Sequence, residues 1–316
     1  MKSALTIALF LLPFIILSQE KFSKEFSFVT DNDLYVSFKR DRYYTNGMFL
    51  NYRYIKDNSN NKLVKKIFEW QLGHEMFTPY KPVVTNIDDH DRPFAGYLYG
   101  GFSVKNVYKK NSILNYGVQI GIVGPNAYGQ ELQEFIHDIY GFKKAEGWEY
   151  QIQNAFGLNL KASFIQRLAF NETKTFDLNL ETLAQVGTIY TDVSAGLNMR
   201  LGFIPLQDIM NSIGYNTNLN NDDTEYKREA ESFFYIKPMV RYAFYDATLQ
   251  GSFLNTSSEV TKELIPVVFD LEVGLKFTAN RFNFGYAFNY NTSKSENLRY
   301  TYGNKYGTIL VSYLIR

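Results

Sequence analysis

Apolar and polar residues alternate over long stretches of this chain. In residues 281–291, RFNFGYAFNYN, an aromatic side chain occupies every second position, and Arg, Asn, Gly or Ala fills the positions between them. A period of two residues places alternate side chains on opposite faces of a β-strand. Residues 45–55 and 306–315 repeat the pattern. Strands of about ten residues are longer than usual and match the length that crosses a bilayer at a tilt.

Aromatic residues on one strand face and small or polar residues on the other are typical of outer-membrane barrels, whose outside contacts lipid and whose lumen is polar. We therefore predict an all-β fold, a closed transmembrane barrel of about twelve antiparallel strands. The expected strands cover residues 25–33, 45–56, 63–75, 94–108, 112–123, 156–169, 174–188, 191–203, 232–247, 264–278, 281–291 and 305–316. Turn sequences separate several of them, at 56–61, 109–112, 171–174 and 278–280.

The connections between these strands alternate between long and short, as in bacterial barrels. Counting from the periplasm, we expect the outer loops at residues 34–44, 76–93, 124–155, 189–190, 248–263 and 292–304. One connection departs from the pattern, because the long polar segment 204–231 falls on the side of the short turns. This departure indicates a strand miscount in that region.

Residues 1–18 form an apolar segment of a different kind. Lys2 precedes an apolar run that ends at the small residue Ser18 and the polar Gln19. This is the pattern of a secretory signal peptide, and the run is too short to span a bilayer. No later window approaches about 18 uninterrupted apolar residues, so we expect no transmembrane helix and one barrel domain over residues 19–316.

Composition narrows the possible chemistry. The chain has no Cys, which excludes disulfides, thiolate metal sites, a cysteine nucleophile and a lipoprotein anchor. A net charge of +1 leaves no basic excess for a nucleic-acid partner. The sequence has neither a GxSxG nucleophile motif nor an HExxH zinc motif, and it contains 3 histidines in all.

A stretch in the expected outer loop 124–155 has helical periodicity. Within residues 129–141, four apolar side chains recur at the spacing of one helix face: Leu132, Ile136, Ile139 and Tyr140. Gln130, Gln133 and His137 form a polar stripe beside them. We expect the helix to pack its apolar side on the barrel and to direct His137 into the space between helix and wall. The alternative is a helical plug or lid on which the histidine is incidental.

A second group of polar residues lies where the first two expected strands meet their connecting loop. Asn32 and Asp33 end one strand, and Thr45 opens the next. Antiparallel neighbours bring these ends together at one rim, where carboxylate, carboxamide and hydroxyl oxygens would suit Ca²⁺. The alternative is that both sequences only form turns, since Asn and Asp are common turn residues.

A third group is the sequence DDHDRPFAG, residues 88–96. Its aspartates around His90 could bind a metal, although such a run is more often a solvated loop. Arg92 and Pro93 enter the next strand, and the proline sets the direction of entry.

These sequences resemble the outer-membrane lipid A 3′-O-deacylase family. The matching blocks are ND at 32–33, RYYTNG at 42–47, DRPFAG at 91–96, IGIVGPNAYGQELQEFIHDIYG at 120–141 and GWEYQIQN at 147–154. The similarity in motifs covers residues 26–157. It implies a barrel of twelve strands in the bacterial outer membrane, with a site at the outer rim between wall and loop helix. The implied reaction is Ca²⁺-dependent removal of the ester-linked acyl group at the 3′ position of lipid A, the lipid anchor of lipopolysaccharide.

The resemblance also implies roles for individual residues. His137 would activate the water, Asp33 would bind or orient the metal, and Asn32 and Thr45 would complete the pocket. Further residues are expected to contact the substrate: Lys81, Arg92 and Gln133. The chain departs from the family where Lys143 replaces a functional glutamate, and Glu146 is a possible substitute.

The reaction is reasonable without a serine nucleophile. A divalent cation can stabilise the oxyanion of ester hydrolysis, and imidazole is a suitable base near neutral pH. Two other functions remain open from the strand pattern alone: a small non-enzymatic porin, and an outer-membrane phospholipase. We expect a monomer.

Overall fold

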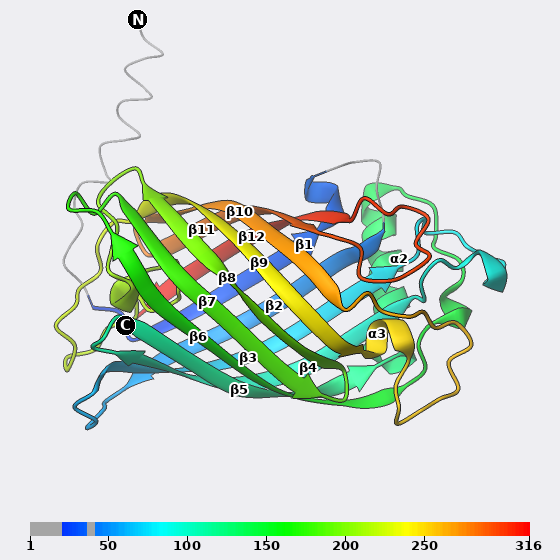
Figure 1. Ribbon diagram of the computed structural model, residues 1–316, viewed down its shortest axis with the longest axis horizontal. Coiled ribbons are helices and arrows are strands. Elements are labelled where there is room, and N and C mark those ends of the chain that lie inside the picture. The colour runs from blue at the N-terminus through cyan, green and yellow to red at the C-terminus, as the bar shows by residue number, and fades with distance from the viewer. Residues whose placement is uncertain (1–20, 37–41) are drawn as a thin grey trace, which may run out of the picture.

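The computed structural model describes residues 21–36 and 42–316. Twelve antiparallel strands close into a barrel, in which each strand pairs with its sequence neighbours and β1 pairs with β12 (Figure 1). The strands are β1 (Lys24–Asn32), β2 (Tyr43–Lys56), β3 (Leu63–Thr78), β4 (Ala95–Tyr108), β5 (Ser112–Val123), β6 (Ala155–Phe170), β7 (Phe176–Gly187), β8 (Tyr190–Gly202), β9 (Ser232–Asp246), β10 (Val267–Ala279), β11 (Phe282–Asn291) and β12 (Asn304–Ile315). The predicted closed barrel is confirmed.

All the long connections except residues 204–231 gather at one end of the barrel, which we call the loop end. Figure 1 shows this end on the right, with helices α2 (Gly129–Tyr140) and α3 (Ala247–Gln250), and the C-terminus at the opposite end. Among the described residues, no helix is both long and apolar enough to cross a membrane. The expected signal peptide, residues 1–18, lies outside the described part of the chain.

Strand alternation separates an apolar outside from a polar inside. Large apolar side chains that face outward are exposed, among them Phe26, Leu50 and Trp70. The alternate positions face the lumen and carry paired charges, such as Arg53 with Glu25 at 2.5 Å. An apolar outside with a polar lumen suits a barrel surrounded by lipid, and closure leaves no unpaired strand edge.

The segment 204–231 is not a strand miscount, so that expectation was wrong. It contains one 3₁₀ turn, η6 (Ile209–Asn211), and folds into the barrel opening opposite the loop end. Lumen-facing Lys65 donates from Nζ to Asn211 Oδ1 at 2.9 Å and to the Thr217 carbonyl at 2.8 Å. The polar residues of the segment therefore bind the polar lumen, which is why it lacks strand periodicity.

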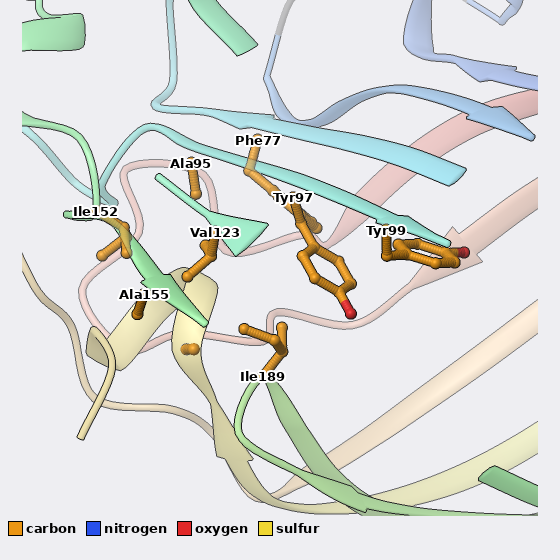
Figure 2. Packing of buried hydrophobic residues seen from close by; sticks show 9 residues of the cluster. Phe77, Ala95, Tyr97, Tyr99, Val123, Ile152, Ala155 and Ile189 are labelled. Carbon is orange, nitrogen blue, oxygen red and sulfur yellow. The ribbon is translucent and has the colours of Figure 1, made fainter. Parts of the chain in front are cut away.

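A buried apolar cluster fixes the strands at the loop end (Figure 2). It joins side chains of β3 to β6 with others from the connecting loops: Phe77, Ala95, Tyr97, Tyr99, Val123, Ile152, Ala155, Ile189 and Ala247. Tyr97 and Tyr99 stack with ring centroids 4.9 Å apart. Because the cluster lies on the inner side of the wall, it holds the rim in place while leaving the outer side to other residues.

Candidate functional site

The outer face of the wall changes character at the loop end. On β1 the outward positions run from exposed Phe26 and Phe28 to buried Thr30 and Asn32. The outward positions of the neighbouring strands likewise end in buried side chains: Asn46 on β2, and His74 and Met76 on β3. Polar side chains on the outside of such a wall are costly unless something covers and binds them. Their burial therefore marks a patch on the outer face of the barrel that other residues cover.

Strand register aligns this patch across four strands. Asn32 pairs with Asn46, Asn46 with Met76, and Met76 with Gly96 on β4. The row runs perpendicular to the strands, with neighbouring strands about 4.8 Å apart. Residues distant in the sequence thus meet on one patch of wall, as the sequence predicts for Asn32 and Thr45.

The loop that contains α2 covers this patch. The ring nitrogen Nε2 of His74 lies 2.8 Å from the carbonyl oxygen of Ala127, just before the helix. The helix begins directly over Gly96, where a side-chain carbon added to this glycine would lie 3.1 Å from the backbone nitrogen of Gly129. Two glycines at this crossing allow the helix to approach the wall closely.

Helix α2 presents its polar stripe to the wall, not its apolar side. Gly129, Gln133 and His137 are its buried residues, and only 4% of His137 is exposed. By contrast, Phe135 and Ile139 are 63% and 64% exposed. The expectation that the apolar side packs on the barrel was therefore wrong. The physical reason is that Gln133 and His137 have polar partners within the loop, the Trp148 indole nitrogen and the Lys143 carbonyl.

Gln133 and His137 have defined partners within the loop. Gln133 Oε1 accepts a hydrogen bond from the indole nitrogen of Trp148 at 2.7 Å, and Trp148 is buried in a cluster with Met76. Nδ1 of His137 lies 2.5 Å from the carbonyl oxygen of Lys143. A carbonyl only accepts, so this contact places the imidazole proton on Nδ1 and the lone pair on Nε2.

The loop end of β1 holds the predicted acidic residue. Asp33 opens the 3₁₀ turn η2 (Asp33–Tyr35) and is buried, and its Oδ2 accepts a hydrogen bond from the Arg42 amide at 2.8 Å. Asn32 Oδ1 accepts from the Leu34 amide at 2.7 Å, which is an Asx turn. The turn-forming alternative from the sequence is thus present in the geometry, and it fixes the position of Asp33.

Thr45 and Asn46 lie at the start of β2, where Asn46 pairs with Asn32, the residue before Asp33. Thr45 lies at a bulge in β2 and donates to the Met76 carbonyl at 3.3 Å. The side-chain oxygen of Asn46 is buried without a hydrogen-bond partner among the described residues. The sequence analysis included Asn46 in the expected strand 45–56 but did not single it out as a site residue. Extending the alternation of Met48 and Leu50 back by two residues would have placed it on the outward face.

The oxygen atoms of this pocket fit a hard cation better than a zinc ion. The described residues contain no cluster of three His, Cys, Asp or Glu side chains. At the rim, Asp33 provides a carboxylate, and nearby residues provide carboxamide and hydroxyl oxygens. Carboxylate and neutral oxygens are the ligands that Ca²⁺ prefers, and the unpartnered oxygen of Asn46 is available for such a role.

A comparison with known families decides where the chain belongs. The family model described as "Outer membrane protein LpxR" matches residues 4–315. The chain belongs to the LpxR family. Membership confirms the family that the motifs indicate and makes the chain an outer-membrane ester hydrolase of the lipid A 3′-O-deacylase type.

The solved structure of a family member agrees with the LpxR assignment at the level of the fold. LpxR from Salmonella typhimurium superposes with a TM-score of 0.73 at 20% identity, over 92% of this chain and 99% of that one. The β domain of the Bordetella autotransporter BrkA is more distant, with a TM-score of 0.49 at 9% identity, over 94% of this chain and 99% of that one. No curated protein sequence shows significant similarity to the chain.

The remaining residues that the LpxR resemblance singles out lie in different places. Lys81 is exposed in the loop between β3 and β4, with Nζ 5.1 Å from the centre of the Tyr80 ring. Glu146 is exposed and joined to that loop through its backbone, whose amide donates to the Pro82 carbonyl at 2.9 Å. Both residues lie in loops near the rim. The contact of Lys81 with substrate and the role of Glu146 as a substitute for the family glutamate stay predictions.

Arg92 is not brought to the outer patch. It is buried beside Phe77, which belongs to the cluster on the inner side of the wall, and its Nη2 donates to the Thr248 carbonyl at 3.0 Å. Burial lowers the pKa of Arg92 to about 10, which leaves it charged at neutral pH. Its observed contacts join the loop after β3 to α3, and its predicted contact with substrate has no support from this position.

Asp91 joins loops. Its carboxylate accepts hydrogen bonds from the Tyr43 hydroxyl at 2.9 Å and from the amides of Tyr80 and Arg299, each at 3.0 Å. These three donors tie together the loops after β3 and β11. The observed geometry therefore gives Asp91 a structural role and leaves the metal interpretation of residues 88–91 without support.

Proposed function

We propose that the pocket between α2 and the outer wall hydrolyses the 3′-O-linked acyloxyacyl ester of lipid A in a calcium-dependent reaction. His137 is the general base, and Asp33 holds the metal with help from Asn32, Thr45 and Asn46. The single observation that carries the proposal is that a helix with His137 in its buried stripe starts over Gly96, at one end of the buried outward row that contains Asn32 and Asn46.

The location of the pocket suits a lipid substrate. The outward face of an outer-membrane barrel contacts lipid, so a pocket on it is reached from the membrane without passing through the lumen. The scissile ester of lipid A lies between the sugar headgroup and the acyl chains. A polar pocket at the top of an apolar wall meets that boundary.

The path of α2 supports a meeting of His137 with the oxygen ligands. The helix starts over Gly96 on β4, and Gln133 is bonded to Trp148, which packs against Met76 on β3. Four residues advance a helix by about 6 Å, slightly more than one strand spacing. Continuing in that direction brings His137 over β2, which carries Thr45 and Asn46.

Each residue then has a chemical task. The Lys143 carbonyl holds His137 with Nε2 as the acceptor, so Nε2 takes the proton of an attacking water and later returns it to the leaving alcohol. The Asp33 carboxylate is held by the Arg42 amide and supplies the negative charge that a cation needs. A bound Ca²⁺ would supply positive charge to the tetrahedral oxyanion.

The porin alternative receives no support from the lumen. The segment 204–231 occupies one opening, and the cluster around Tyr97 occupies part of the other end. One cavity inside the barrel, near Lys105 and Glu272, has a volume of about 190 Å³.

Purified protein in detergent tests the proposal against the phospholipase alternative. Wild-type protein and the variant His137→Gln would each receive lipid A or a glycerophospholipid, with Ca²⁺ or with a chelator. We expect release of the 3′ acyl group from lipid A only with wild-type protein and Ca²⁺. Hydrolysis of the glycerophospholipid with lipid A untouched would refute the substrate, and full activity in chelator would refute the metal.

A further inference from the structure

We propose that α2 is an interfacial helix whose exposed apolar flank contacts the acyl chains of the outer leaflet. The proposal rests on the location of the barrel in the membrane and holds whether or not the proposed hydrolysis is correct. At about 3.6 residues per turn, the buried stripe of Gly129, Gln133 and His137 has two different flanks. One flank is apolar and the other acidic: Leu132, Phe135, Ile136 and Ile139 against Glu131, Glu134 and Asp138.

The exposed apolar surface extends beyond the end of the helix. Phe135 and Ile139 are mostly exposed, and the surface continues beyond the helix end through Tyr140 and Phe142, whose rings stack at 5.7 Å. Apolar surface left in water costs about 25 cal/mol per Å². An exposed patch made of several large apolar side chains therefore indicates a contact surface.

The position of the helix identifies what covers this patch. Helix α2 crosses the wall at Gly96, and below this level the outward faces of the same region expose Ile120 and Phe156. Those strand faces contact lipid in an outer-membrane barrel. The helix that bears the patch therefore starts on the lipid-facing side of the wall. A helix that lies along the rim has one flank toward the membrane and one toward water. We therefore assign the apolar flank of α2 to the membrane and the acidic flank to water.

This arrangement connects the membrane directly to the candidate base. The ring of Phe142 lies 5.6 Å from the imidazole of His137, measured between ring centroids, so the apolar surface extends to the edge of the pocket. The next residues, Lys143 and Lys144, are exposed cations at the level where anionic headgroups begin. An acyl chain that follows the apolar flank arrives beside His137.

The two tryptophans of the chain make a direct test possible. Trp70 is 54% exposed on the lipid-facing wall, whereas Trp148 is 1% exposed beneath the helix. A Trp70→Phe background retains the shielded Trp148, and Ile139→Trp adds a reporter on the apolar flank. The matched control is Glu131→Trp on the acidic flank. Both variants would be placed in vesicles whose lipids carry bromine near the headgroup end of the acyl chains, and in vesicles brominated near the chain end.

We expect bromine near the headgroup to quench about half of the emission added by Ile139→Trp, with less quenching by bromine near the chain end. The Glu131→Trp reporter should instead respond to aqueous acrylamide and not to brominated lipid. Equal access of acrylamide to both reporters would overturn the proposal. So would an Ile139→Trp reporter shielded from both quenchers, which would indicate burial against a second copy of the chain. Neither readout depends on hydrolysis.

Discussion

The carbonyl oxygen of Lys143 lies 2.5 Å from Nδ1 of His137. The turn that makes this contact follows Gly141, whose φ of 70° lies in the left-handed region that favours glycine. The contact comes from the main chain, although the family resemblance implies a functional glutamate at this position. The fold can thus orient His137 without a carboxylate side chain.

This relationship predicts that Lys143→Ala retains activity within about twofold of wild type, since the substitution leaves the carbonyl in place. Initial rates of lipid A deacylation in detergent would measure the effect. A loss of about 100-fold would show that the lysine side chain itself takes part. Lys144→Ala is the matched control, because it removes a neighbouring exposed charge.

Replacement of Asn46 tests the metal pocket at a residue that the sequence motifs did not single out. Asn46→Leu keeps a similar volume and removes the buried oxygen that has no partner among the described residues. We expect the Ca²⁺ concentration for half-maximal activity to rise by about tenfold or more, because loss of a group that binds or orients a metal commonly weakens binding by such factors. An unchanged calcium requirement would exclude Asn46 from the pocket.

The crossing of α2 over the wall predicts a strong effect of one methyl group. A side-chain carbon at Gly129 would lie 2.7 Å from the Trp148 ring, so Gly129→Ala must displace the helix or the indole. We expect activity to fall by about tenfold or more with the barrel still folded, because small misplacements of catalytic groups are costly. Gly100→Ala is the control, since a carbon there meets no atom within 4 Å. Heat-modifiable migration on gels would report barrel folding for both variants.

The segment 204–231, which fills one opening of the barrel, forms ion pairs with two arginines, and these pairs predict a large difference in stability between the two variants. Arg200 is buried and ion-paired with Asp177 and with Glu231, at 3.1 Å in the second case. Arg200→Met leaves two buried carboxylates without their partner, and we expect a loss of about 3–5 kcal/mol in unfolding free energy. Arg167→Met breaks a more exposed pair with Asp208 and should cost about 1 kcal/mol or less. Urea titration of the folded barrel would compare them, and equal losses would contradict the buried role of Arg200.

Much of the fold could be predicted from the sequence because lipid outside and a polar lumen inside impose a strict period of two on every strand. That period locates the strands of Leu50 and Phe284 without any knowledge of pairing. It also brings Asn32 and Thr45 to one rim, since antiparallel neighbours must share an end. The motif blocks that indicated the family lie at this rim.

The sequence-based predictions were wrong where tertiary contacts, and not the local sequence, determine the structure. The apolar residues of α2 suggested packing on the barrel, but the polar stripe is buried instead, where Gln133 and His137 have partners in Trp148 and the Lys143 carbonyl. The segment 204–231 has no strand or helix period because its polar groups bind lumen side chains such as Lys65. Neither outcome is encoded in local periodicity.

Mass spectrometry of lipid A from cells that express the protein tests the central claim most directly. The samples are wild type, His137→Gln and Asp33→Asn, with heat-modifiable migration confirming a folded barrel in each. We predict that wild type yields lipid A without its 3′ acyloxyacyl group, and that each variant converts less than about 1% of the amount that wild type converts. Full acylation with folded wild-type protein, or undiminished deacylation by the His137→Gln variant, would contradict a hydrolytic site between α2 and the barrel wall.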